Sequence, residues 1–120
     1  EKNKTMPNSY KDLIVWQKSK ELAIIVYKVT DKFPKSELYG LTNQIRRATI
    51  SISSNIAEGS RRFHDKEKKQ LFSVAFGSGA ELESQIDIAR ELFPQVDFLN
   101  IEPILEEIMK ILNSFIKRLS

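Results

Sequence analysis

The chain has 120 residues, of which 41% are hydrophobic and 29% charged, which is typical of one globular domain. It has no cysteine and one histidine, which excludes disulfides and thiolate sites and leaves too few ligands for most metal centres. Residues 1–62 hold 12 basic and 6 acidic side chains, whereas residues 63–120 hold 7 basic and 10 acidic ones. This asymmetry permits an anionic partner on one face.

Residues 1–9 are expected to form a flexible N-terminal segment, followed by a single domain over residues 10–120. The first helix is predicted over about residues 12–32, with Asp12 as its N-cap and Phe33-Pro34 at its end. Residues spaced along one face of this helix predict a buried stripe: Val15, Ser19, Leu22, Ala23, Val26, Val29, Thr30 and Phe33.

A second helix is predicted from Glu37 or Leu38 to Glu58, with Gly59 as its stop signal. The third is predicted over about 65–92 and the fourth over about 99–119, with Pro103 in the first turn, where proline is tolerated. Each helix has one apolar stripe and the connections are short. The sequence therefore predicts an all-α, antiparallel up-down-up-down four-helix bundle. No apolar run is long enough to span a bilayer and no export signal is present, so we expect a cytoplasmic protein without a membrane partner.

Several apolar residues exceed what a monomeric bundle needs. Phe72 and Phe76 lie off the main stripe of the third helix, and Ile50 lies opposite the core stripe of the second. Gly77 and Gly79 each cost roughly 1 kcal/mol relative to alanine inside a helix, so the close approach of another backbone is expected to compensate. We therefore expect a homo-oligomer with Ile50, Phe72 and Phe76 at subunit contacts. The alternative is an irregular bundle in which these side chains pack under loops.

Two polar side chains near the end of the second helix are expected to be structural. Asn55 projects close to the core stripe, so it should be at least half buried and must find hydrogen-bond partners. A bond to a neighbouring helix is one interpretation, and contact with a ligand is the other. Glu58 lies beside it and is placed to pair with an arginine such as Arg62.

No arrangement of residues predicts catalysis. His64 has no second ligand at a metal-binding spacing, and no phosphate-binding loop or nucleophile motif is present. Glu81 and Glu83 point about 160° apart on a helix, at ~100° per residue, and cannot share a proton. We expect no enzyme activity, no cofactor and no metal.

Basic residues are placed more suggestively than acidic ones. Arginine suits phosphate because its planar fork donates two hydrogen bonds, and binding to nucleic acid without sequence preference needs several cations on one surface. The alternative is an ordinary solvated surface. The candidate phosphate contacts are Arg46, Arg47, Arg61, Arg62, Lys66, Lys68 and Lys69.

Several segments form a distinctive set in the first two predicted helices: YKDL at 10–13, WQK at 16–18, FP at 33–34, Glu37, YGL at 39–41, QIRRA at 44–48 and SISSNIAEG at 51–59, with Arg62 after them. Gly77-Ser78 and Glu81-Leu82 belong to the same set in the third helix. In these segments the sequence resembles the bacterial four-helix-bundle proteins of the 23S ribosomal RNA intervening-sequence family. The family usually has proline where Ser53 stands, so the second helix is expected to be straighter here.

The resemblance implies a small bundle that assembles into ring-like homopentamers and has no catalytic activity. It also implies a relation to accessory subunits of diversity-generating retroelements, in which a basic pentamer surface contacts nucleic acid and a reverse transcriptase. We therefore expect a non-enzymatic, pentameric protein that binds nucleic acid, with RNA as the expected ligand, through phosphate neutralisation. The alternatives are a scaffold or accessory subunit that docks a partner such as a reverse transcriptase, and a structural subunit with no ligand.

Overall fold

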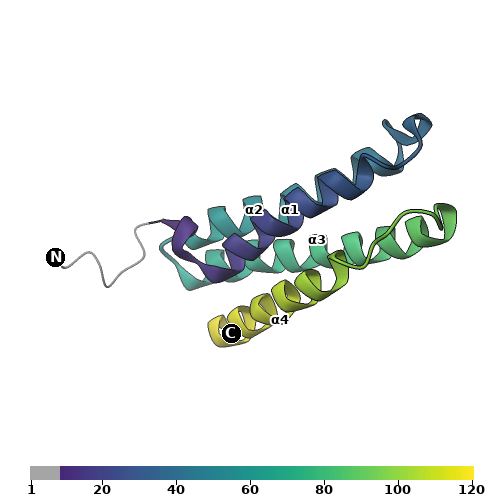
Figure 1. Cartoon of the computed structure of the whole chain (residues 1–120). Helices are drawn as coiled ribbons and strands as arrows, with labels where there is room; N and C mark the ends of the chain where they lie inside the picture. The colour runs from purple at the N-terminus through teal and green to yellow at the C-terminus, as the bar shows by residue number, and fades with distance from the viewer. Residues whose placement is uncertain (1–8) are drawn as a thin grey trace.

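The computed structural model describes residues 9–120 and places four α-helices and no strand in that range (Figure 1). The helices are α1 (Ile14–Thr30), α2 (Leu41–Ser60), α3 (Asp65–Leu92) and α4 (Ile101–Leu119), with the 3-10 turns η2 (Tyr10–Asp12) and η3 (Lys35–Glu37) before α1 and α2. The prediction of an all-α protein with four helices is confirmed. The segment expected to be flexible lies outside the described residues apart from Ser9, whose Oγ accepts a hydrogen bond from the Lys11 amide.

The helix boundaries agree best for α3, which begins and ends at the predicted residues, with Pro94 two residues after its end. α1 begins two residues later than predicted, since Asp12 belongs to η2 and Leu13 occupies the N-cap position. The prediction of Asp12 as the N-cap is therefore wrong. The prediction of Gly59 as the stop of α2 is also wrong, because the helix continues through Gly59 to Ser60.

The core lies where the four apolar stripes meet. The predicted stripes of all four helices supply it, and their central members, such as Leu22, Ile52, Leu82 and Ile108, are fully buried. α2 packs most extensively against α3, and α1 and α3 each also contact α4. Burial of these side chains is the main stabilising term, at about 25 cal/mol for each Å² of apolar surface removed from water.

Aromatic contacts close both ends of the core. Phe33 packs against Phe93 with ring centroids 4.7 Å apart and against Phe98 at 5.9 Å. At the other end Phe72 packs against Phe115 with centroids 5.6 Å apart. The latter contact places the C-terminal turns of α4 beside the first turns of α3.

Two glycines allow helices to approach closely. A Cβ at Gly59 would lie 2.8 Å from the Phe72 ring, and a Cβ at Gly79 would overlap the sulfur of Met109 on α4. The prediction that another backbone approaches these glycines is therefore wrong at Gly79, because the side chain of Met109 occupies the space beside it. Nothing lies within 4 Å of a Cβ built on Gly77, which is exposed.

The three connections between helices lie at the two ends of the molecule (Figure 1). Figure 1 shows the connection from α2 to α3 at the same end as the C-terminus, while the other two connections lie at the opposite end. Among residues 9–120, no helix combines the length and the apolar character needed to cross a membrane.

Candidate nucleic-acid interface

The seven predicted phosphate contacts fall into two groups. Arg46 and Arg47 lie in the N-terminal half of α2, whereas the other five lie in or just after the connection from α2 to α3. From Arg47 to Arg61 the helix rises about 21 Å at 1.5 Å per residue. The fold does not bring the two groups together within one copy of the chain.

Arg46 is committed to the packing of α2 against α1. Its Nε donates to Thr30 Oγ1 at 2.8 Å. Its Nη2 lies 3.1 Å from the Asp31 carboxylate and 3.4 Å from the Tyr27 carbonyl, both in the last turn of α1 or just after it. The guanidinium also lies over the Tyr27 ring, 4.5 Å from its centroid. A cation here stabilises the carbonyl end of α1, so Arg46 acts as a tether between helices.

Arg47, unlike Arg46, is not held by contacts with α1. It is exposed and has no hydrogen bond or ion pair to any other residue of the described chain. It lines a shallow depression together with Tyr27, Asn43, Arg46, Ile50 and Ser51. Its guanidinium is therefore available to an outside anion.

The second group forms a cationic surface at one end of the bundle. The Arg61 guanidinium lies 5.6 Å from the centroid of the Tyr10 ring, which brings η2 beside this connection. Arg62 pairs with Glu58 at 2.5 Å, as predicted. Lys68 donates from Nζ to the Ser60 carbonyl at 3.1 Å and so caps the end of α2.

The remaining cations of this group have no such partner. Lys66 and Lys69 make no hydrogen bond or ion pair within residues 9–120, and Lys66 is exposed. His64, at the N-cap position of α3, is also exposed. Phe63 stands between Arg62 and His64, and 94% of its surface is exposed.

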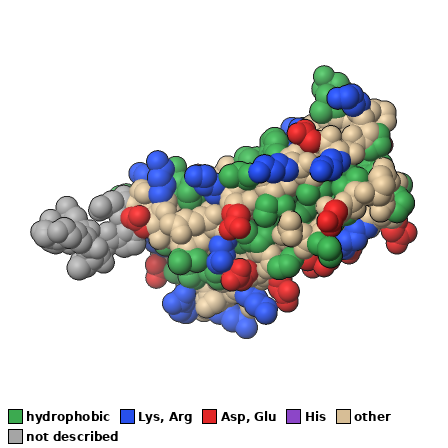
Figure 2. All heavy atoms as spheres, viewed as in Figure 1, with side chains coloured by type: hydrophobic (Ala, Val, Ile, Leu, Met, Phe, Trp, Pro, Cys, Tyr) green, Lys and Arg blue, Asp and Glu red, His purple; other side chains and the backbone are tan. Residues whose placement is uncertain are grey.

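Three more cations at this end were missed from the sequence. Lys11 follows Tyr10 in η2, and Lys117 and Arg118 lie in the last turn of α4. Figure 2 shows Lys and Arg side chains gathered over the C-terminal end of α4. A signal was present, because a four-helix bundle places the end of its fourth helix beside the start of its third. We call the whole set the basic end: Lys11, Arg61, Arg62, Lys66, Lys68, Lys69, Lys117 and Arg118.

The basic end has a net positive charge. Its eight cations face four carboxylates in the same turns, those of Asp12, Glu58, Asp65 and Glu67, which leaves a net charge of +4. The rest of residues 9–120 holds nine cations and eleven carboxylates. The fold thus adds three cations that are distant in the sequence, Lys11, Lys117 and Arg118, to the five of the connection and the start of α3.

Asn55 is part of a polar network inside α2, which corrects one interpretation of it. It is half-buried, as predicted. Its Nδ2 donates to the carbonyl and to the Oγ of Ser51, at 2.8 and 3.1 Å, and not directly to a neighbouring helix. The link to α3 is made by Ser51, whose Oγ lies 2.8 Å from Ser78 Oγ. A short amide side chain reaches the carbonyl one turn back more easily than it reaches another helix.

The residues predicted at subunit contacts separate in the structure. Phe72 is only 5% exposed, since it packs into the space above Gly59 and against Phe115. Phe76 is half-buried and packs against the core. The expectation that these two phenylalanines form surplus apolar surface is therefore wrong for Phe72 and holds only in part for Phe76. Ile50 is 42% exposed.

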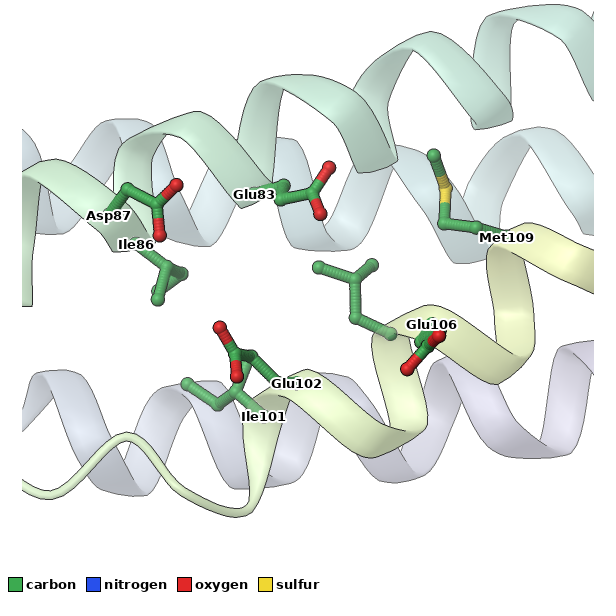
Figure 3. A pocket seen from close by; sticks show the side chains of 8 residues that line it. Glu83, Ile86, Asp87, Ile101, Glu102, Glu106 and Met109 are labelled. Atoms are coloured by element: carbon green, nitrogen blue, oxygen red, sulfur yellow. The ribbon is translucent and has the colours of Figure 1, made fainter.

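An acidic pocket of about 370 Å³ lies between α3 and α4. Figure 3 shows Glu83 and Asp87 extending from α3, and Glu102 from α4, into the space between the helices. Arg90 pairs with both Asp87 and Glu102 and so offsets part of this charge. Within residues 9–120, no group of three or more His, Asp or Glu side chains is arranged to hold a metal ion.

Comparison with protein families gives one identification. Comparison with curated proteins returns no match. The model of the 23S rRNA-intervening sequence protein family matches residues 11–114, which include all of α1, α2 and α3 and most of α4. The chain therefore belongs to the 23S rRNA-intervening sequence protein family.

Proposed function

We propose that this protein is a non-enzymatic homo-oligomer, a pentamer, that acts in the cytoplasm and binds RNA by neutralising phosphates with its basic end. The helices run up-down-up-down in this proposal, which the short connections and the contacts of Ser51 with Ser78 and of Gly59 with Phe72 support. The observation that carries the binding proposal is the net +4 charge at one end, where Lys66 and Lys69 have no partner within the described chain.

Phosphate neutralisation follows from the kind of cations present. A cation that is already paired gives up that pair to bind phosphate, whereas an unpaired one gives up only water. Lys66 and Lys69 are therefore the strongest candidates, and Arg61 gives up only its contact with the Tyr10 ring. Arg47 is also unpaired but lies outside the basic end. Releasing counterions from the nucleic acid drives such binding, which makes it steeply dependent on salt.

Self-association is supported by apolar surface on α2 and α3. Ile50 is 42% exposed and Val74 is 46% exposed. Gly77, one turn after Val74, meets open space, so nothing within the described chain offsets its helix-propensity cost of roughly 1 kcal/mol. Ile50 and Gly77 are the sequence neighbours of Ser51 and Ser78, which join the two helices. An approaching copy of the chain would cover this surface.

Fluorescence anisotropy with a labelled RNA, measured over a range of salt concentrations, tests the binding proposal. We expect Lys66→Gln with Lys69→Gln to weaken binding and to reduce the slope of log affinity against log salt by about 1.5 for each protomer in contact. The matched control is Lys28→Gln with Lys32→Gln, since both lysines are exposed and lie away from the basic end. Arg46 is unsuitable as a probe because its loss would loosen α1 from α2.

Two results would overturn the binding proposal. One is the absence of RNA binding by the unmodified protein at low salt. The other is an equal loss of binding in the control variant, which would show that total charge matters and not its place. If copies assemble but no RNA binds, the exposed apolar side chains favour the second candidate function, docking of a partner protein on the assembled ring.

A further inference from the structure

The most exposed large apolar side chain of the described residues lies in the middle of the basic end. Phe63 is 94% exposed, in the four-residue connection between Ser60 of α2 and Asp65 of α3. Its backbone neighbours on both sides are Arg62 and His64. We propose that the Phe63 ring stacks on an unpaired nucleobase, so that the basic end binds single-stranded RNA in preference to duplex RNA. This inference rests on the proposed function.

The connection holds Phe63 between two ordered helix ends. The amides of Arg61 and Arg62 donate to the carbonyls of Glu58 and Gly59, at 3.1 and 3.2 Å. On the other side the Lys68 amide donates to the His64 carbonyl at 3.0 Å. Because the backbone is fixed one residue before and one residue after Phe63, a base that stacks on the ring has little chain entropy to overcome.

The packing of the protomer gives no reason for an aromatic ring at this position. A fully exposed phenylalanine buries none of the surface that makes aromatic residues stabilising. It has no ring contact within the described residues, whereas Tyr10 contacts both Trp16 and Arg61. Its surroundings supply what a base needs: a free ring face for stacking, and cations at Arg61 and Lys66 for the adjoining phosphates.

A base inside duplex RNA has no free face on which the Phe63 ring could stack. Its bases already stack on one another inside the helix, and only phosphates, sugars and a shallow groove reach a protein. An unpaired base presents both faces. Stacking on an aromatic side chain is worth about 1–3 kcal/mol for each base and depends little on which base is present. The expected preference is therefore for strandedness and not for sequence.

Tyr39 provides a natural comparison. It is 91% exposed and lies in the connection before α2, at the opposite end of the bundle. Its neighbours are Leu38 and Gly40, and no cation lies within three residues of it. Exposure of an aromatic ring is thus common to both connections, but the combination with clustered cations occurs only at Phe63.

The test compares two RNAs of about 12 nucleotides, one single-stranded and one fully paired, by fluorescence anisotropy at one salt concentration. Phe63→Ala should weaken binding to the single strand by about 5- to 150-fold and change duplex binding by no more than about twofold. Phe63→Tyr keeps the ring and should restore binding. Phe63→Leu keeps the apolar bulk without the ring and should not. Tyr39→Ala should leave both affinities unchanged.

The outcomes separate the stacking from the phosphate contacts. If the unmodified protein binds neither RNA at low salt, the proposed function and this inference fail together. If it binds with a steep salt dependence, but Phe63→Ala weakens binding to both RNAs equally or to neither, the stacking inference is wrong and the proposed function stands. Full recovery of RNA binding with Phe63→Leu would also overturn it, because apolar bulk without a ring would then be enough and stacking would not be needed. Circular dichroism should show unchanged helix content in every variant, since the side chain is exposed.

Discussion

Arg46 and Arg47 show how adjacent residues of one type take up different roles. The Arg46 side chain is 20% exposed and contacts α1 through Thr30, Asp31 and the Tyr27 carbonyl. Arg47 is exposed to solvent and makes no hydrogen bond or ion pair within residues 9–120. The helix places successive side chains about 100° apart, so the one that reaches the end of α1 is fixed by the register of α2. This pair therefore permits a matched experiment.

Arg46→Ala should lower the free energy of unfolding by about 2 kcal/mol, because hydrogen bonds to a charged group are lost and the stacking on Tyr27 disappears. Arg47→Ala should change it by less than about 0.5 kcal/mol, as is usual for an exposed side chain without partners. Urea denaturation at equal protein concentrations measures both. Equal midpoints for the two variants would contradict the role of Arg46 as a tether.

At the scale of the helices, Gly59 and Gly79 differ in what surrounds them. Gly59 faces the Phe72 ring, which is itself held against Phe115. Gly79 faces the end of Met109, a flexible side chain that also lines the acidic pocket. A thioether beside an open pocket has somewhere to move, whereas a ring in a filled core does not.

We therefore expect Gly59→Ala to destabilise the protein by about 1–3 kcal/mol through overpacking, in spite of the better helix propensity of alanine. Gly79→Ala should lie within about 1 kcal/mol of the unmodified protein, since the propensity gain offsets the displacement of Met109. Thermal unfolding followed by circular dichroism distinguishes the two. A larger loss for Gly79→Ala than for Gly59→Ala would show that Met109 cannot move.

The helices themselves were predictable because their apolar periodicity is strong. The stripe through Leu105, Ile108 and Leu112 indicates both the existence and the inward face of α4. The errors arose where tertiary packing outweighs local preference. Gly59 reads as a stop signal in the sequence, but the helix continues through it, and the Phe72 ring occupies the space that this glycine leaves. Phe72 reads as surplus for the same reason, since its partner Phe115 is 43 residues away.

The candidate site was predictable only in part. The neighbouring cations of the connection are visible in the sequence. Lys11 lies near them because the ring of the preceding residue, Tyr10, contacts Arg61. Arg118 lies near them because it contacts the Phe115 ring, which packs against Phe72 of α3. The commitment of Arg46 to α1 could not be inferred either, because it depends on where the last turn of another helix lies. Periodicity in the sequence predicts which face of a helix carries a residue, whereas the residue that it contacts on another helix depends on how the helices pack.

At the scale of the whole molecule, the positive charge lies at one end of the bundle, so self-association would affect how strongly the protein binds a polyanion. A cyclic assembly relates its copies by rotation about one axis, so every copy presents the same end on the same side when the bundle runs along that axis. The +4 charge of one basic end would then be repeated around a ring. Fields of like sign add, and a ring would attract a polyanion more strongly than one protomer does.

Replacing Ile50, which lies on the outer face of α2, tests this assembly. Ile50→Glu should shift the mass measured by light scattering from about five times the 13.9 kDa protomer toward a single protomer, because a carboxylate would have to be buried at the contact. Leu38→Glu is the control, since Leu38 is 46% exposed but lies in the connection before α2.

Gly77→Ala should weaken assembly while it strengthens α3 in the separated chain, because the added methyl group occupies the space left for the approaching copy. A protomer mass for the unmodified protein at micromolar concentration would contradict the proposal. Unchanged assembly of Gly77→Ala would instead place the contact on another face.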